Sequence, residues 1–134
     1  MSSWLLDTTA LLAHFRQEAG AETVQTILGD ASSSVHISSL SITEFARRLR
    51  ALGADAVEAR ATALEYAGLV SGVIPVDVAT ATRAFEIGEF SSSRLPIVDA
   101  LIAASASILG ATLLHCDAHF DGLASDILTQ QSIR

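Results

Sequence analysis

The sequence predicts one α/β domain built around a mainly parallel sheet. The chain has 134 residues, which suits a single domain spanning residues 1–134. Half of the residues are hydrophobic, so the chain is able to bury a substantial core. Short apolar runs alternate with longer stretches of helical spacing, and this alternation is typical of parallel strands joined by helices.

Five short segments are predicted strands. The first is Trp4-Leu5-Leu6, the next three lie at 35–37, 73–76 and 111–114, and the tail at 127–133 holds a fifth. Pro75 indicates that the third segment is an edge strand, because proline lacks the N–H that a central strand donates.

Helices are predicted between these strands from apolar spacing and from capping residues. A turn over 38–41 precedes a helix that starts near Ile42 and ends at Gly53. The helix before the fourth strand begins at Asp99, stops at Gly110 and is otherwise almost uncharged. The remaining predicted helices cover 10–18, 22–28, 55–66, 77–90 and 120–124.

Charge and cysteine content exclude several functions. The formal net charge is −7, with eight arginines and no lysine, which is a poor basis for passive nucleic-acid binding. Without lysine, Schiff-base chemistry and a Walker-type phosphate site are excluded. The single cysteine, Cys116, excludes an intrachain disulfide and a cysteine zinc cluster. No secretory signal or membrane-spanning run is recognisable, so we expect a cytoplasmic protein with no membrane partner.

Four acids occupy comparable places around the predicted sheet. Asp7 follows the first strand and Asp117 follows the fourth, whereas Glu44 and Asp99 lie in the predicted first turns of helices. The carboxyl ends of parallel strands and the starts of the helices that follow them share one edge of a sheet. We therefore expect the four carboxylates to converge at that edge.

Each acid also has a purely structural explanation. Asp7 and Asp117 suit helix caps, Ser41-Ile42-Thr43-Glu44 fits a capping box, and Asp99 complements a helix dipole. Taken together, however, converging carboxylates repel one another unless cations neutralise them. Hard oxygen ligands select Mg²⁺ or Mn²⁺, and ions held in this way suit attack on a phosphodiester.

Four segments carry a resemblance to a known family. They are Leu5-Leu6-Asp7-Thr8-Thr9-Ala10-Leu11-Leu12-Ala13, Ser41-Ile42-Thr43-Glu44-Phe45, Pro96-Ile97-Val98-Asp99-Ala100-Leu101-Ile102-Ala103-Ala104 and Leu113-Leu114-His115-Cys116-Asp117-Ala118-His119-Phe120. Together they resemble the PIN-domain ribonucleases, in particular the VapC-type toxins of toxin–antitoxin pairs. The resemblance extends from Trp4 to about Leu123.

The resemblance implies a three-layer α/β/α sandwich, with a central sheet of four to five short strands, and Mg²⁺- or Mn²⁺-dependent endoribonuclease activity. Asp7 and Asp99 match the family's metal ligands. Glu44 matches its second acid and Asp117 the acid after the fourth strand, so all four are expected to be catalytic and metal-binding. Thr9 matches a hydroxyl residue that supports the site. The family also implies an RNA substrate, a homodimer and an inhibitory cognate antitoxin.

Several arginines are candidates for contact with RNA phosphates. Arg94, just before the Asp99 helix, is the best placed of them in the sequence, and we group it with Thr9 as substrate-binding. Arg47, Arg48 and Arg50 are further candidates. Arg48 has an alternative role, because its spacing from Glu44 also suits an ion pair along one helix.

Three other features are expected to lie outside the metal site. His115 and His119 are four residues apart, but a strand end intervenes, so they are not predicted to bind zinc. Asp121 is expected on the outer face of the last short helix. The apolar spacing of Leu49, Leu52 and Leu64 makes the two helices that carry them a candidate partner surface.

Alternative functions are weighed against the nuclease. A receiver-type signalling domain needs a lysine late in the chain, and this chain has none. A haloacid-dehalogenase-type phosphatase needs an aspartate two residues after the first one, where this chain has Thr9. Both classes are therefore disfavoured. The alternatives that stay open are a non-catalytic PIN-type scaffold or RNA-binding module, and a solitary PIN ribonuclease with no antitoxin.

Overall fold

The computed structural model of the protein describes residues 2–134. A five-stranded sheet has the order β3-β2-β1-β4-β5, and every neighbouring pair of strands is parallel. The strands are β1 (Ser2–Leu6), β2 (Ser33–Ser38), β3 (Gly72–Ile74), β4 (Thr112–His115) and β5 (Gln130–Ser132). The predicted parallel sheet is confirmed, and β3 is an edge strand that ends before Pro75.

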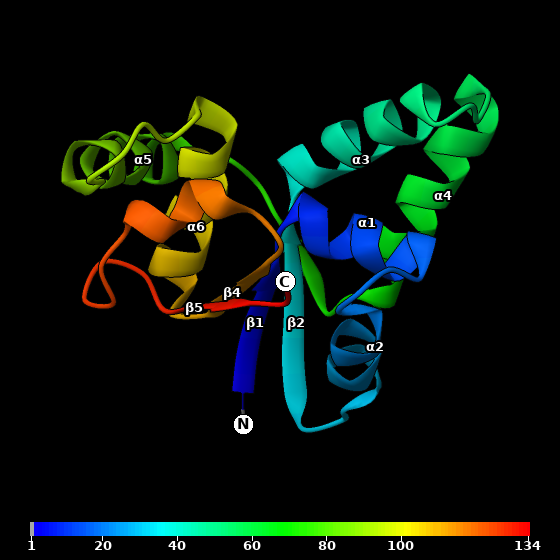
Figure 1. The fold of residues 1–134 in the computed structure, drawn as a ribbon, viewed down its shortest axis with the longest axis horizontal. Helices are drawn as coiled ribbons and strands as arrows, with labels where there is room; N and C mark the ends of the chain where they lie inside the picture. The colour runs from blue at the N-terminus through cyan, green and yellow to red at the C-terminus, as the bar shows by residue number, and fades with distance from the viewer. Residues whose placement is uncertain (1) are drawn as a thin grey trace.

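Helices cover both faces of this sheet (Figure 1). One group of helices is α1 (Thr8–Arg16), α2 (Ala21–Gly29), α3 (Ser39–Ala51) and α4 (Ala56–Leu69). The opposite side carries α5 (Val78–Phe90) and α6 (Ile97–Leu109), and a short 3₁₀ turn, η1 (Ala118–Gly122), follows β4. The predicted α/β/α sandwich is therefore confirmed.

The core consists of two apolar clusters, one on each face of the sheet. Successive side chains of a strand point to opposite faces, and β1 shows the result. Leu6 belongs to the cluster that includes Phe45 from α3, whereas Leu5 belongs to the cluster that includes Ile102 from α6. Phe120, fully buried in the second cluster, anchors η1 beneath the end of β4.

The start of α3 differs from the prediction. Residues 38–41 do not form a separate turn, because β2 runs directly into α3 and Ser38 caps it by accepting a hydrogen bond from the Leu40 N–H at 3.2 Å. Glu44 therefore lies in the second turn of α3 rather than the first. Ser41 is inside the helix and fully buried, so the predicted capping box of Ser41 and Glu44 is wrong.

The predicted partner surface on α3 and α4 also needs correction. Leu49 is only 2% exposed and belongs to the core, so it is not available to a partner. Leu52 and Leu64 are 49% and 43% exposed. Among residues 2–134, no helix has both the length and the apolar character needed to cross a membrane.

Candidate active site

Asp7 stands between the end of β1 and the start of α1, of which it is the N-cap. Its carboxylate accepts hydrogen bonds from the Thr9 N–H at 3.1 Å and from the Thr9 hydroxyl at 2.5 Å. Thr9 Oγ1 in turn accepts from the Cys116 N–H at 2.9 Å, just beyond β4. Thr9 therefore fixes the Asp7 carboxylate and ties it to the neighbouring strand. The side chain of Asp7 is both a helix cap and a buried member of the site.

Glu44 is positioned by α1 rather than by its own helix. The Thr8 hydroxyl donates to Glu44 Oε1 at 2.6 Å and lies 3.0 Å from the Ser41 hydroxyl. The alternative pairing with Arg48 is wrong, since no ion pair within residues 2–134 joins Arg48 to Glu44. Arg48 lines the same cavity as Glu44, and Arg47 does so as well.

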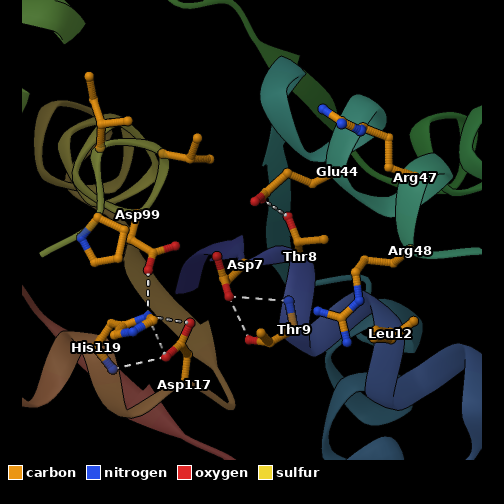
Figure 2. Close-up of a pocket in the computed structure, with 13 residues that line it drawn as sticks. Asp7, Thr8, Thr9, Leu12, Glu44, Arg47, Arg48, Asp99, Asp117 and His119 are labelled. Carbon is orange, nitrogen blue, oxygen red and sulfur yellow. Dashed lines mark hydrogen bonds and ion pairs between the residues drawn. The ribbon is translucent and has the colours of Figure 1, made fainter. Parts of the chain in front are cut away.

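Asp99 and Asp117 meet on the other side of the cavity, as Figure 2 shows. Asp99 lies in the first turn of α6, and Asp117 caps η1 by accepting from the His119 N–H at 2.9 Å. The ring atom His119 Nδ1 is 2.9 Å from Asp99 and 3.1 Å from Asp117. His119 thus bridges two acids that are 18 residues apart in the sequence.

The four acids line one cavity of about 470 Å³. Helices α1 and α3 contribute to one side of it, and the start of α6 and the turn η1 contribute to the other (Figure 2). Besides the acids, its lining includes Thr8, Thr9, Leu12, Arg47, Arg48, Pro96, Ile97, Val98 and His119. The carboxylates predicted from strand ends and helix starts are therefore brought together.

Burial makes this cavity unfavourable for negative charge. Burial raises the pKa of Asp7 to about 7, against the hydrogen bonds from Thr9. The charges of Asp99 and Glu44 add to that rise. Burial likewise raises the pKa of Asp99 to about 6, and the charge of Asp117 contributes. A cation bound between these carboxylates would offset both their burial and their mutual repulsion.

His119 also lines the cavity and has a metal-binding side chain, although it is not among the site residues predicted from the sequence. The charge of Asp117 raises the pKa of His119, and Asp99 adds to that rise. The other histidine considered, His115, has both ring nitrogens engaged, by Gln130 at 2.8 Å and by the Asp117 N–H at 3.1 Å. The spacing of His119 from Asp117, two residues into a capped turn, is the signal that could have indicated it.

Two further candidates lie outside the cavity lining. Asp121 is exposed and pairs with Arg134 at 2.8 Å, as expected for the outer face of η1. Arg94 is exposed and does not line the cavity, so its contact with RNA stays a prediction.

The parallel sheet and the acids at its carboxyl edge define an α/β domain with an acidic cleft. A model of the PIN domain family matches residues 4–125, so the chain belongs to the PIN-domain family. The sequence matches none of the curated proteins with which it was compared.

Solved structures share the fold at low sequence identity. A chain of VapBC2 from Rickettsia felis, bound to a DNA fragment from its promoter, is 15% identical, with 97% of this chain and 98% of that chain covered and a TM-score of 0.76. A chain of a toxin–antitoxin complex from Klebsiella pneumoniae is 16% identical, with 97% of each covered and a TM-score of 0.72. The sarcin–ricin loop cleaving toxin VapC20 from Mycobacterium tuberculosis is 18% identical, with 90% and 96% covered and a TM-score of 0.69.

Proposed function

We propose that the protein is a divalent-metal-dependent endoribonuclease that acts as the toxin of a toxin–antitoxin pair. The observation that carries this proposal is the convergence of Asp7, Glu44, Asp99 and Asp117 on one cavity. Membership of the PIN-domain family supports it. The likeness to VapC20, described as a toxin that cleaves the sarcin–ricin loop, is consistent with it.

The donor set fits Mg²⁺ or Mn²⁺. Carboxylate oxygens are the ligands that these ions prefer. Burial and repulsion between neighbouring acids raise the pKa values of Asp7 and Asp99, so a bound cation would stabilise their charged forms. Asp7 and Asp99 would be the principal ligands, joined by Glu44 and Asp117. A bound ion supplies an activated water and charge stabilisation for cleavage of a phosphodiester.

The chain's own residues position these ligands and the substrate. Thr9 orients the Asp7 carboxylate and Thr8 orients that of Glu44, each through a short hydrogen bond. Arg47 and Arg48 lie at the cavity and are placed to attract phosphates toward an acidic protein. No protein nucleophile is needed, because water is the attacking group.

Partners follow from the same assignment. We propose a cognate antitoxin that covers the acidic cavity, in keeping with the toxin–antitoxin complex from Klebsiella pneumoniae, and a homodimer acting in the cytoplasm. A solitary PIN ribonuclease would lack the antitoxin, and a small adjacent gene encoding a DNA-binding protein distinguishes the two. A non-catalytic scaffold would bind partners without cleaving RNA.

RNA cleavage by the purified protein tests the proposal. The wild type is expected to cut RNA when Mg²⁺ or Mn²⁺ is added, whereas Asp7→Asn and Asp99→Asn should lose at least about 99% of the rate. Asp121→Asn is the matched control, because this acid lies outside the cavity lining. Equal behaviour of the wild type and the two site variants would refute the nuclease and favour the scaffold.

A further inference from the structure

The His119 ring lies between two carboxylates of the site. Its Nδ1 atom is 2.9 Å from Asp99 Oδ2 and 3.1 Å from Asp117 Oδ1, as Figure 2 shows. The side chain is 53% exposed, so core packing does not hold the ring in place. Only the backbone N–H of His119, which donates to Asp117, is required for the cap of η1. The ring is therefore turned toward the acids without being needed by the fold.

The separation of these three atoms matches that of metal ligands. Neighbouring ligands of an octahedral ion with bonds of about 2.1 Å lie about 3 Å apart, and Nδ1 has this separation from each of the two oxygens. One ligand atom from each of Asp99, Asp117 and His119 lies within 4.8 Å of the others. In its neutral form protonated on Nε2, the ring directs a lone pair from Nδ1 along the line on which its N–H otherwise donates.

We propose that His119 Nδ1 is a ligand of the divalent ion that Asp99 and Asp117 hold. This inference rests on the proposed metal-dependent function and adds a nitrogen ligand to its four carboxylates. An imidazole nitrogen suits transition metals, whereas Mg²⁺ prefers oxygen ligands alone. The mixed ligand set therefore selects Mn²⁺ over Mg²⁺, and His119 is the origin of that preference.

Two other roles of His119 predict different results. If the ring only reinforces the η1 cap through Asp117, its removal leaves metal affinity unchanged. If the ring occupies the place of the ion, its removal makes Mn²⁺ bind more tightly. A ligand is the only one of the three roles for which removal weakens Mn²⁺ binding more than Mg²⁺ binding.

Binding of Mn²⁺ and Mg²⁺ to the whole chain tests the proposal, with isothermal titration as the readout. His119→Ala should weaken Mn²⁺ binding roughly tenfold or more and Mg²⁺ binding by less than about threefold. His119→Asp, which offers oxygen in place of nitrogen, should restore affinity but lose the preference for Mn²⁺. Pulsed electron paramagnetic resonance of bound Mn²⁺ should detect nitrogen coupling in the wild type and not in either variant.

His14→Gln is the matched control, because His14 bonds to Tyr66 and Gln25 and does not line the cavity. Circular dichroism confirms that the variants are folded. Unchanged or tighter Mn²⁺ binding by His119→Ala, equal weakening for both ions, or absence of nitrogen coupling in the wild type would each overturn the ligand role. The proposed function is tested separately, by comparing RNA cleavage by the wild type with cleavage by the Asp7 and Asp99 variants. Its failure is therefore distinguishable from failure of the ligand role of His119.

Discussion

The carboxylate of Asp7 is the least favourable charge in the site at neutral pH. It is 2% exposed, and burial raises its pKa from 3.8 to about 7. A folded-state pKa above the unfolded value means that the folded protein holds this proton more tightly, so stability falls as pH rises from about 4 to about 7. A shift of this size corresponds to about 4 kcal/mol.

Asp7→Asn should therefore stabilise the metal-free protein at pH 8 by roughly 2 to 4 kcal/mol. Asparagine keeps a side-chain oxygen for the cap of α1 and removes the buried charge. The two proteins should become nearly equal in stability at pH 4, where Asp7 is protonated. Urea unfolding in the presence of a chelator at both pH values measures this difference. A variant that is less stable than the wild type at pH 8 would contradict it.

The Thr9 hydroxyl links Asp7, at the end of β1, to the backbone just beyond β4. Thr9→Val removes the donor to Asp7 and the acceptor of the Cys116 N–H. We expect the protein to be destabilised by about 2 kcal/mol, because the Cys116 N–H loses its hydrogen-bond acceptor. The pKa of Asp7 should also rise further, since the hydrogen bonds from Thr9 lower it.

Thr9→Ser is the control for this change, because it retains the hydroxyl and removes only a methyl group. Urea unfolding at pH 8 compares the three proteins. Equal stability of the valine and serine variants would show that the hydroxyl does not hold the two strands together.

At the scale of elements, α3 brings cations to the cavity. Arg48→Ala should weaken RNA binding several-fold and reduce the slope of its salt dependence by about 0.7 for each phosphate that is no longer neutralised. Filter binding in an Asp99→Asn background measures affinity without cleavage. Arg60→Ala on α4 is the control, since Arg60 is exposed and does not line the cavity. Equal effects of the two substitutions would indicate a general charge effect.

The turn between α1 and α2 depends on close approach to the C-terminus. Gly20 has φ +94°, and a Cβ there would lie 2.8 Å from the Ile133 carbonyl oxygen. Gly20→Ala should destabilise the protein by about 3 kcal/mol. Gly53→Ala, with φ +109° but open space, should destabilise it by about 1 kcal/mol. Thermal unfolding compares them, and equal destabilisation would exclude a steric effect at Ile133.

The sequence predicts which strands and helices exist better than it predicts the residue at which each one begins. The first four strands each contain a short apolar run that the sequence makes visible, as in 111–114. The fifth lies within the predicted tail 127–133, but it consists of the polar residues Gln130–Ser132 and carries no such signal. The start of α3 was misplaced, because Ser38, Ser39 and Ser41 are all suitable caps and only the direct passage from β2 into the helix selects Ser38. The consequence reached the site, since the capping box assigned to Glu44 depended on that start.

The site followed from the sequence to the extent that it depends on strand ends. Asp7 and Asp117 were found from their positions after apolar strands, and both line the cavity. His119 was not found in this way. Its spacing from Asp117 is a local signal for the contact with that acid, but its contact with Asp99 depends on how η1 turns against the start of α6, which no local pattern encodes. The roles of Thr8 and Ser41 beside Glu44 likewise arise only from the packing of α1 against α3.

At the scale of the whole molecule, two apolar cores hold an acidic edge in place. Leu5 and Leu6 direct β1 into both cores, so the end of that strand, and Asp7 after it, has little freedom to move away from the other acids. The repulsion at the edge is therefore not relieved by motion of the strands. Protonation relieves this repulsion, and the proposed cation would relieve it as well, so the two would compete for the same carboxylates.

Because of this competition, the four acids should lower the stability of the metal-free protein and raise that of the metal-loaded protein. At pH 8, Mn²⁺ at about 100 times its dissociation constant should stabilise the wild type by about 3 kcal/mol, because it binds only the folded chain. The double variant Asp7→Asn, Asp99→Asn should melt above the wild type without metal and gain nothing when Mn²⁺ is added. Differential scanning calorimetry measures both effects, with Asp121→Asn as a control that keeps the wild-type response. A wild type whose melting temperature does not change in millimolar Mn²⁺ would contradict the proposal that the convergent acids hold an ion.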